Sequence, residues 1–161
     1  MKKIGIFKAM KLCKDYEKMS AEKQQEIQKK RLEEIVEYAR KNSPYYRKLY
    51  QNVPQSFSLT DLPQTDKKNL MENWNDWVCD KELTLEEVEK FMEDTDNIGR
   101  KLKKKYLVFT TSGSTGNPLV SIYDNTANNV MGGISARRSY ARKEDLVAFI
   151  KRGGKSIGVF A

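Results

Sequence analysis

Residues 106–119 read Tyr-Leu-Val-Phe-Thr-Thr-Ser-Gly-Ser-Thr-Gly-Asn-Pro-Leu, and they decide how the rest of the fold is interpreted. The run Leu107–Phe109 is apolar and β-prone, which predicts a short buried strand. The hydroxyl- and glycine-rich segment that follows predicts a loop. Residues 120–123 are again β-prone, so a second strand is predicted directly after that loop.

The loop between these two runs has the composition of a phosphate-binding loop. Glycines let the backbone come close to an anion, and hydroxyls donate hydrogen bonds to phosphate oxygens without carrying charge. The candidate binding residues are Thr111, Ser112, Gly113, Ser114, Thr115, Gly116, Asn117 and Pro118. An ordinary Ser/Thr/Gly hairpin turn is the alternative. A Walker loop is excluded, because Asn117 and not lysine follows Gly116.

The 161-residue chain has a globular composition, with 39% hydrophobic and 32% charged residues. It contains no histidine, which excludes histidine-based triads, histidine metal sites and histidine acid–base chemistry, and we assign no metal-ligating residue. Residues 51–99 have 4 basic and 12 acidic side chains, whereas residues 100–161 have 12 and 3. The basic cluster at residues 100–105 predicts either attraction for polyanions or simply a solvated, lysine-rich loop.

Residues 1–19 carry six lysines that interrupt their apolar residues, which is not the pattern of a signal peptide. No stretch of the chain is long and apolar enough to predict a membrane span. We interpret residues 1–19 as a helical arm packed on the rest of the fold, the alternative being a basic amphipathic helix on a membrane surface. Cys13 and Cys79 do not suggest a disulfide framework, which predicts a reducing, cytoplasmic location.

Apolar spacing and capping residues predict further helices along the chain. They are expected over residues 20–39, 44–50, 66–78, 85–92, 125–142 and 146–150. Ser43, Thr65 and Thr84 are the predicted N-caps of the second, third and fourth of these helices. Gly153-Gly154 is expected to end the last helix, and the apolar residues 156–161 predict a core strand.

Aromatic residues recur at helical spacing in two of the predicted helices. Tyr45, Tyr46 and Tyr50 are interpreted as core or interface residues, although tyrosines can also stack on nucleic acid bases. Trp74 and Trp77 lie on an apolar stripe that we interpret as core packing and not as a cofactor site.

Residues 111–118 resemble, position by position, the phosphate loop of the adenylate-forming superfamily, which includes acyl-CoA synthetases, luciferases and peptide-synthetase adenylation domains. Two blocks upstream of the loop make the resemblance more specific. They are residues 38–47, YARKNSPYYR, and residues 62–67, LPQTDK. In this order the three blocks look like the branch of the phenylacetate–CoA ligases and their relatives, including synthetases that adenylylate a deazaflavin coenzyme. Many members carry a lysine beside the loop proline, where this chain has Asn117 and Leu119.

This resemblance implies an ATP-dependent, AMP-forming ligase or adenylyltransferase. Such enzymes use Mg²⁺ to activate a carboxylate or phenol acceptor as an adenylate, and some then transfer it to CoA. The implied fold class is α/β, with a helical N-terminal region at residues 1–99 and the start of an α/β nucleotide-binding subdomain, its sheet incomplete, at residues 100–161. The acceptor-binding, ribose-binding and catalytic-lysine motifs have no matching position here, so we expect an N-terminal fragment that is inactive alone.

Two other classes of function stay open at this point. One is a non-enzymatic module that binds nucleotide or another polyanion through its basic patches. The other is a structural or dimerising domain built on the tyrosine-bearing helices. We expect no nucleic acid and no membrane partner, but we do expect self-association, because a strand at residues 156–161 would present an open edge.

Overall fold

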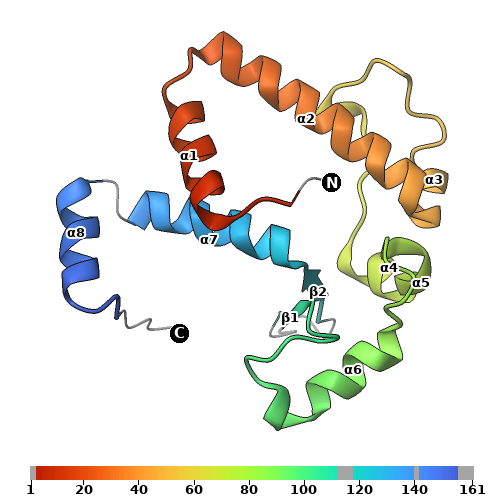
Figure 1. Ribbon diagram of the computed structural model, residues 1–161. Helices are drawn as coiled ribbons and strands as arrows, with labels where there is room; N and C mark the ends of the chain where they lie inside the picture. Colours follow the sequence, from red (N-terminus) through yellow and green to blue (C-terminus); the bar gives the residue numbers. More distant parts are fainter. Residues whose placement is uncertain (1–2, 112–117, 140–141, 156–161) are drawn as a thin grey trace. The chain divides into compact units, whose positions relative to one another are not determined.

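The computed structural model describes residues 3–111, 118–139 and 142–155 (Figure 1). In these ranges the protein is mostly helical, with a small antiparallel sheet of two strands. The chain divides into two compact units, a terminal unit of residues 1–19 with 126–161 and a central unit of residues 20–125. The division at residue 99 that the family resemblance implies stays a prediction. None of the helices in the described ranges combines the length and the apolar character that a membrane span requires.

Where the terminal unit is described, it consists of three helices. They are α1 (Ile6–Glu17), α7 (Asn125–Ser139) and α8 (Lys143–Lys151). The expected helical arm is present as α1, and its buried Ala9 packs on the buried Gly133 of α7. The residue pair Arg137 and Glu17 forms a salt bridge of 2.8 Å between the same two helices. Helix α8 ends at two glycines with φ of 80° and 67°, backbone angles that glycine adopts at little cost, as the sequence predicts.

The described residues of the central unit form five further helices and two short 3₁₀ turns. They are α2 (Ala21–Asn42), α3 (Pro44–Leu49), η1 (Leu59–Asp61), α4 (Lys67–Glu72), α5 (Trp74–Trp77), α6 (Leu85–Glu93) and η2 (Thr95–Asn97). The N-caps predicted at Ser43 and Thr84 are confirmed, because each hydroxyl accepts a hydrogen bond from a backbone amide of the first turn. The first long helix is capped in the same way by Ser20.

The N-cap predicted at Thr65 is wrong by one residue. The Asp66 carboxylate accepts from the backbone N–H of Asn69 at 2.8 Å, and the Thr65 hydroxyl is hydrogen-bonded to Tyr45 instead. The single helix expected over residues 66–78 is also divided into α4 and α5, because the chain departs from helical geometry at Asn73.

The two strands form a hairpin around the candidate loop. Strand β1 (Leu107–Thr110) pairs with β2 (Val120–Tyr123) in the antiparallel register that sets Thr110 opposite Val120. Both predicted strands are therefore confirmed. The prediction that Phe109 is buried is wrong, since this side chain is 49% exposed, because a lone two-stranded sheet is covered on one face only.

The hydrophobic core of the central unit lies where the hairpin meets α5 and α6. Its buried members are Trp74, Leu83, Val88, Leu102, Tyr106 and Val120. The indole N–H of Trp74 donates to the backbone carbonyl of Leu83 at 3.2 Å, so the largest core side chain has its polar atom satisfied. The core strand predicted at residues 156–161 lies outside the described residues.

Candidate functional site

The base of the candidate phosphate loop is closed by two hydrogen bonds. The Thr111 backbone N–H donates to the Leu119 carbonyl at 3.1 Å, and the Leu119 N–H donates to the Thr111 hydroxyl at 2.9 Å. Accepting this bond does not use the hydroxyl's own proton, so Thr111 keeps a donor for a ligand. Thr111 and Pro118 are both exposed, whereas residues 112–117, which carry the rest of the predicted site, lie outside the described residues.

The basic cluster before β1 forms a tight turn between Leu102 and Tyr106. These two residues exchange both backbone hydrogen bonds at 2.9 Å. Lys103 and Lys104 between them have φ of 50° and 57°, in the left-handed region that non-glycine residues adopt only rarely. Because Leu102 and Tyr106 are buried in the core, their packing holds this turn in place.

Three lysines of the basic cluster are engaged by neighbouring groups of the central unit. Lys101 Nζ donates to the Asn125 side chain at 2.6 Å, and Lys103 Nζ donates to the Glu82 carbonyl at 2.7 Å. Lys105 Nζ lies 3.0 Å from the Asp80 carboxylate and 4.5 Å from the centre of the Tyr106 ring. These lysines, from which attraction for polyanions is predicted, therefore serve largely to attach the turn to the rest of the central unit.

The turn and the candidate loop also lie at opposite ends of β1. A strand rises about 3.3 Å per residue, so Lys105 and Thr111 are separated by roughly 20 Å along the strand direction. That separation exceeds the screening length of about 8 Å at physiological salt. A phosphate held by the loop would therefore depend on backbone amides and hydroxyls, and not on the lysines that precede β1.

The carboxyl group of Asp80 has a pKa that its surroundings shift strongly. Its carboxylate accepts hydrogen bonds from the Tyr106 hydroxyl and from Lys105. These bonds lower the pKa of Asp80 from 3.8 to about 2, and the bond from Tyr106 has the larger effect. Burial, followed by the bond to Asp80, raises the pKa of Tyr106. Both shifts keep the carboxylate charged and the phenol protonated, which suits a structural link better than proton transfer near neutral pH.

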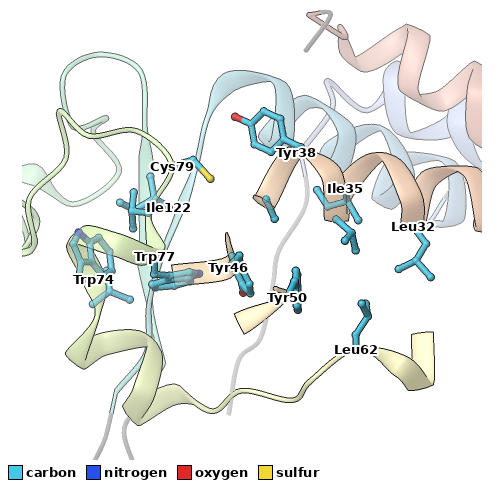
Figure 2. A pocket seen from close by; sticks show the side chains of 14 residues that line it. Leu32, Ile35, Tyr38, Tyr46, Tyr50, Leu62, Trp74, Trp77, Cys79 and Ile122 are labelled. Carbon is cyan, nitrogen blue, oxygen red and sulfur yellow. The ribbon is translucent and has the colours of Figure 1, made fainter. Parts of the chain in front are cut away.

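An apolar pocket of about 440 Å³ opens beside the hairpin, in the central unit (Figure 2). Its lining is aliphatic and aromatic, without a charged side chain. The lining residues are Leu32, Ile35, Val36, Tyr38, Ala39, Tyr46, Tyr50, Leu62, Trp74, Trp77, Val78, Cys79, Val120 and Ile122. Strand β2, which starts two residues after Pro118, thus supplies part of the pocket wall.

The aromatic side chains of the pocket are arranged in two pairs. Tyr46 stacks on Tyr50 with 5.3 Å between ring centres, and Trp74 meets Trp77 edge-on at 5.5 Å. Burial raises the pKa of the Cys79 thiol, so this sulfur stays protonated and is a poor nucleophile. The pocket therefore offers shape and apolar contact, with few polar groups to orient a ligand.

The sequence did not predict this pocket, because its walls come from segments far apart in the chain. The tyrosine and tryptophan stripes predict packing, and Trp74 does belong to the core. Trp77, Tyr46 and Tyr50 also face the pocket. The recurrence of aromatic residues on two neighbouring short helices was the one signal that could have indicated a cavity.

A scan against models of protein families found no match, and searches of curated proteins and of solved structures likewise found none. Among the described residues, no group of three or more Cys, Asp or Glu side chains is placed to hold a metal ion.

Proposed function

We propose that this chain is the N-terminal part of an ATP-dependent, AMP-forming ligase or adenylyltransferase of the phenylacetate–CoA ligase type. The observation that carries the proposal is the hydroxyl- and glycine-rich loop, whose ends are joined by the Thr111–Leu119 hydrogen bonds at the end of a hairpin. Fixing both ends of the loop lowers the entropy lost when its amides and hydroxyls gather around a phosphate. The order of the three sequence blocks supports the same proposal.

The reaction that we propose joins the acceptor to AMP. A carboxylate or phenolate oxygen of the acceptor attacks the α-phosphorus of ATP, the bond to the bridging oxygen breaks, and pyrophosphate leaves. The loop at residues 111–118 would hold the departing pyrophosphate oxygens through neutral donors. We assign Mg²⁺ to the triphosphate, since this ion is commonly held by substrate phosphates with only one or two carboxylates. The proposal includes the fold class: the enzyme would have the larger α/β sheet of the adenylate-forming superfamily.

We place the apolar body of the acceptor in the pocket beside β2. The pocket volume of about 440 Å³ is within the range of sites for small molecules. Its lining without charges favours an aromatic or aliphatic group whose carboxylate or phenol points out of the pocket.

Titration calorimetry with ATP and Mg²⁺ tests the loop. We expect weak binding by the wild type and none by a Gly113→Val, Gly116→Val double variant, because the new side chains would block the approach of phosphate to the backbone. Gly5→Val is the control, since a side chain there meets nothing within 4 Å. Equal affinity in the double variant would refute the proposal. ATP binding without pyrophosphate release by the longer enzyme would favour a nucleotide-binding module.

Tryptophan fluorescence tests the pocket separately, because both tryptophans of the chain line it. Aromatic acids should quench or shift the emission of the wild type. Ala39→Phe, which places a ring in the pocket, should remove the effect. Ala21→Phe is the matched control on an exposed position of the same helix. Identical responses of the two variants would exclude the pocket as the acceptor site without touching the loop.

A further inference from the structure

The excess positive charge of the chain lies in one of its two units. The terminal unit has 13 basic and 4 acidic residues, whereas the central unit has 17 and 18. The two units therefore have opposite net charges, and the terminal one accounts for the whole excess. An anionic partner would be attracted to the terminal unit.

Within that unit, α1 is held in one orientation. Ala9 packs against Gly133, Asn129 donates to the Ile4 carbonyl at 3.1 Å, and Glu17 is paired with Arg137. These three contacts span the helix from its start to its last residue. The side of α1 that carries them is turned to α7, and the opposite side is left for solvent.

Four residues line that outward side, three of them in α1 and the fourth, Lys18, its C-cap, and the exposed Asp15 lies beside them. Phe7, Lys11, Lys14 and Lys18 follow one another at steps of four, three and four residues, which places them in one line along a helix. All four are exposed, and Phe7 is 82% exposed. In the described part of the chain the three lysines form no ion pair. The line therefore presents three unpaired cations and one aromatic ring.

We propose that this line of Phe7 and three lysines is a docking surface for an anionic lipid bilayer. A basic helix with an aromatic residue lies in the interface plane, where its lysines meet acidic headgroups and its ring enters the boundary with the acyl chains. Single exposed apolar residues are common on protein surfaces, but Phe7 lies on the same side of the helix as the three lysines. Peripheral binding of this kind departs from the sequence-based expectation of no membrane partner.

The same surface could in principle attract a nucleic acid, and Phe7 separates the two partners. A bilayer needs only an apolar side chain at this position, so leucine should serve almost as well as phenylalanine. A single-stranded nucleic acid would need the ring face for stacking, which leucine lacks. Phe7 lies near the start of α1, before the first lysine of the line. This position favours insertion of the ring into a bilayer while the lysines contact its headgroups.

Vesicle co-sedimentation with the full 161-residue chain tests the charge. We expect binding to vesicles with about 30% phosphatidylserine, little binding to neutral vesicles, and release as salt rises from about 0.05 to about 0.3 M. Lys11→Glu with Lys14→Glu should lower partitioning at least about tenfold, given the contribution of each lysine near an acidic surface. Lys29→Glu with Lys30→Glu on α2 changes the net charge equally and should have little effect.

The Phe7 variants complete the test. Phe7→Ala should lower partitioning about fivefold or more, and Phe7→Leu should retain most of it. Circular dichroism of each variant checks that the helices are intact. Equal loss in the α1 and α2 charge variants would overturn the proposal, as would equal binding to neutral vesicles. Loss in Phe7→Leu equal to that in Phe7→Ala, together with tight binding of single-stranded nucleic acid, would assign the surface to nucleic acid instead.

Discussion

Replacing Gly133 by alanine should weaken the contact between α1 and α7. A β-carbon at this position would lie 2.6 Å from Ala9 Cβ, 2.8 Å from the Ile6 carbonyl oxygen and 3.1 Å from the Met10 backbone nitrogen. None of these atoms belongs to the far end of a flexible side chain, so the two helices would have to move apart. Gly132→Ala is the matched control, because a β-carbon there meets only the Ile6 side chain, at 3.3 and 3.9 Å.

The expected magnitudes follow from two opposing effects. Alanine in place of glycine within a helix stabilises it by about 1 kcal/mol. Overpacking of a tight contact costs about 1–3 kcal/mol. The neighbours of Gly133 are rigid, so the cost of Gly133→Ala should be near the upper end of this range. Gly133→Ala should therefore destabilise the terminal unit by about 1–2 kcal/mol. Gly132→Ala should stabilise it by up to about 1 kcal/mol, since the Ile6 side chain can turn aside.

Hydrogen exchange of the α1 amides measures this difference locally, and urea unfolding followed by circular dichroism measures it globally. Exchange in α1 should be faster in Gly133→Ala and unchanged or slower in Gly132→Ala. The close approach of the two helices would be refuted if both variants changed protection in the same direction. Retained protection in Gly133→Ala alone would show that α1 does not pack on this glycine.

Two further predictions concern the central unit. Asp80, whose pKa is lowered to about 2 chiefly by the Tyr106 hydroxyl, should contribute about 1–2 kcal/mol of stability that is present above pH 4 and lost as the pH falls toward 2. In Asp80→Asn the urea midpoint should depend less on pH between about pH 4 and pH 2. The same pH dependence as in the wild type would contradict the assignment. Ser43→Ala should cost about 2–3 kcal/mol, because the buried hydroxyl caps α3 and also donates to the Asp76 carbonyl at 2.9 Å. Ser20→Ala removes an exposed cap whose second bond, to the Glu22 carboxylate, is also exposed, and should cost about 1 kcal/mol or less; equal losses would show that the buried bond of Ser43 is unimportant.

Helix starts were predictable from the sequence where one residue alone could act as the cap. Thr84 stands between two leucines and has no competitor, and Pro44, which favours the first helical position, selects Ser43 over Asn42. Thr65 and Asp66 both could cap α4, and the choice was made by the tertiary contact of Thr65 with Tyr45. A local rule cannot include a partner twenty residues away in the chain.

The candidate site was predictable only in part, for a related reason. The loop at residues 111–118 has a pattern that can be recognised locally. The fate of the lysines before β1 depends on Asp80, Glu82 and Asn125, which reach the turn only after folding. The apolar pocket likewise exists only when α2, α3 and α5 come together beside β2.

The three blocks that carry the family resemblance have different physical roles in the structure. In residues 38–47, Arg40 donates to the carbonyls of Tyr50 and Val53, and Arg47 donates to the carbonyls of Arg40 and Lys41. These bonds fix the corner between α2 and α3, so the block is explained by folding alone. Residues 62–67 contribute a cap and a pocket wall. The loop's hydroxyls and glycines exceed what a closed hairpin needs, so the functional proposal depends on residues 111–118, and the titration of the loop variants is its decisive test.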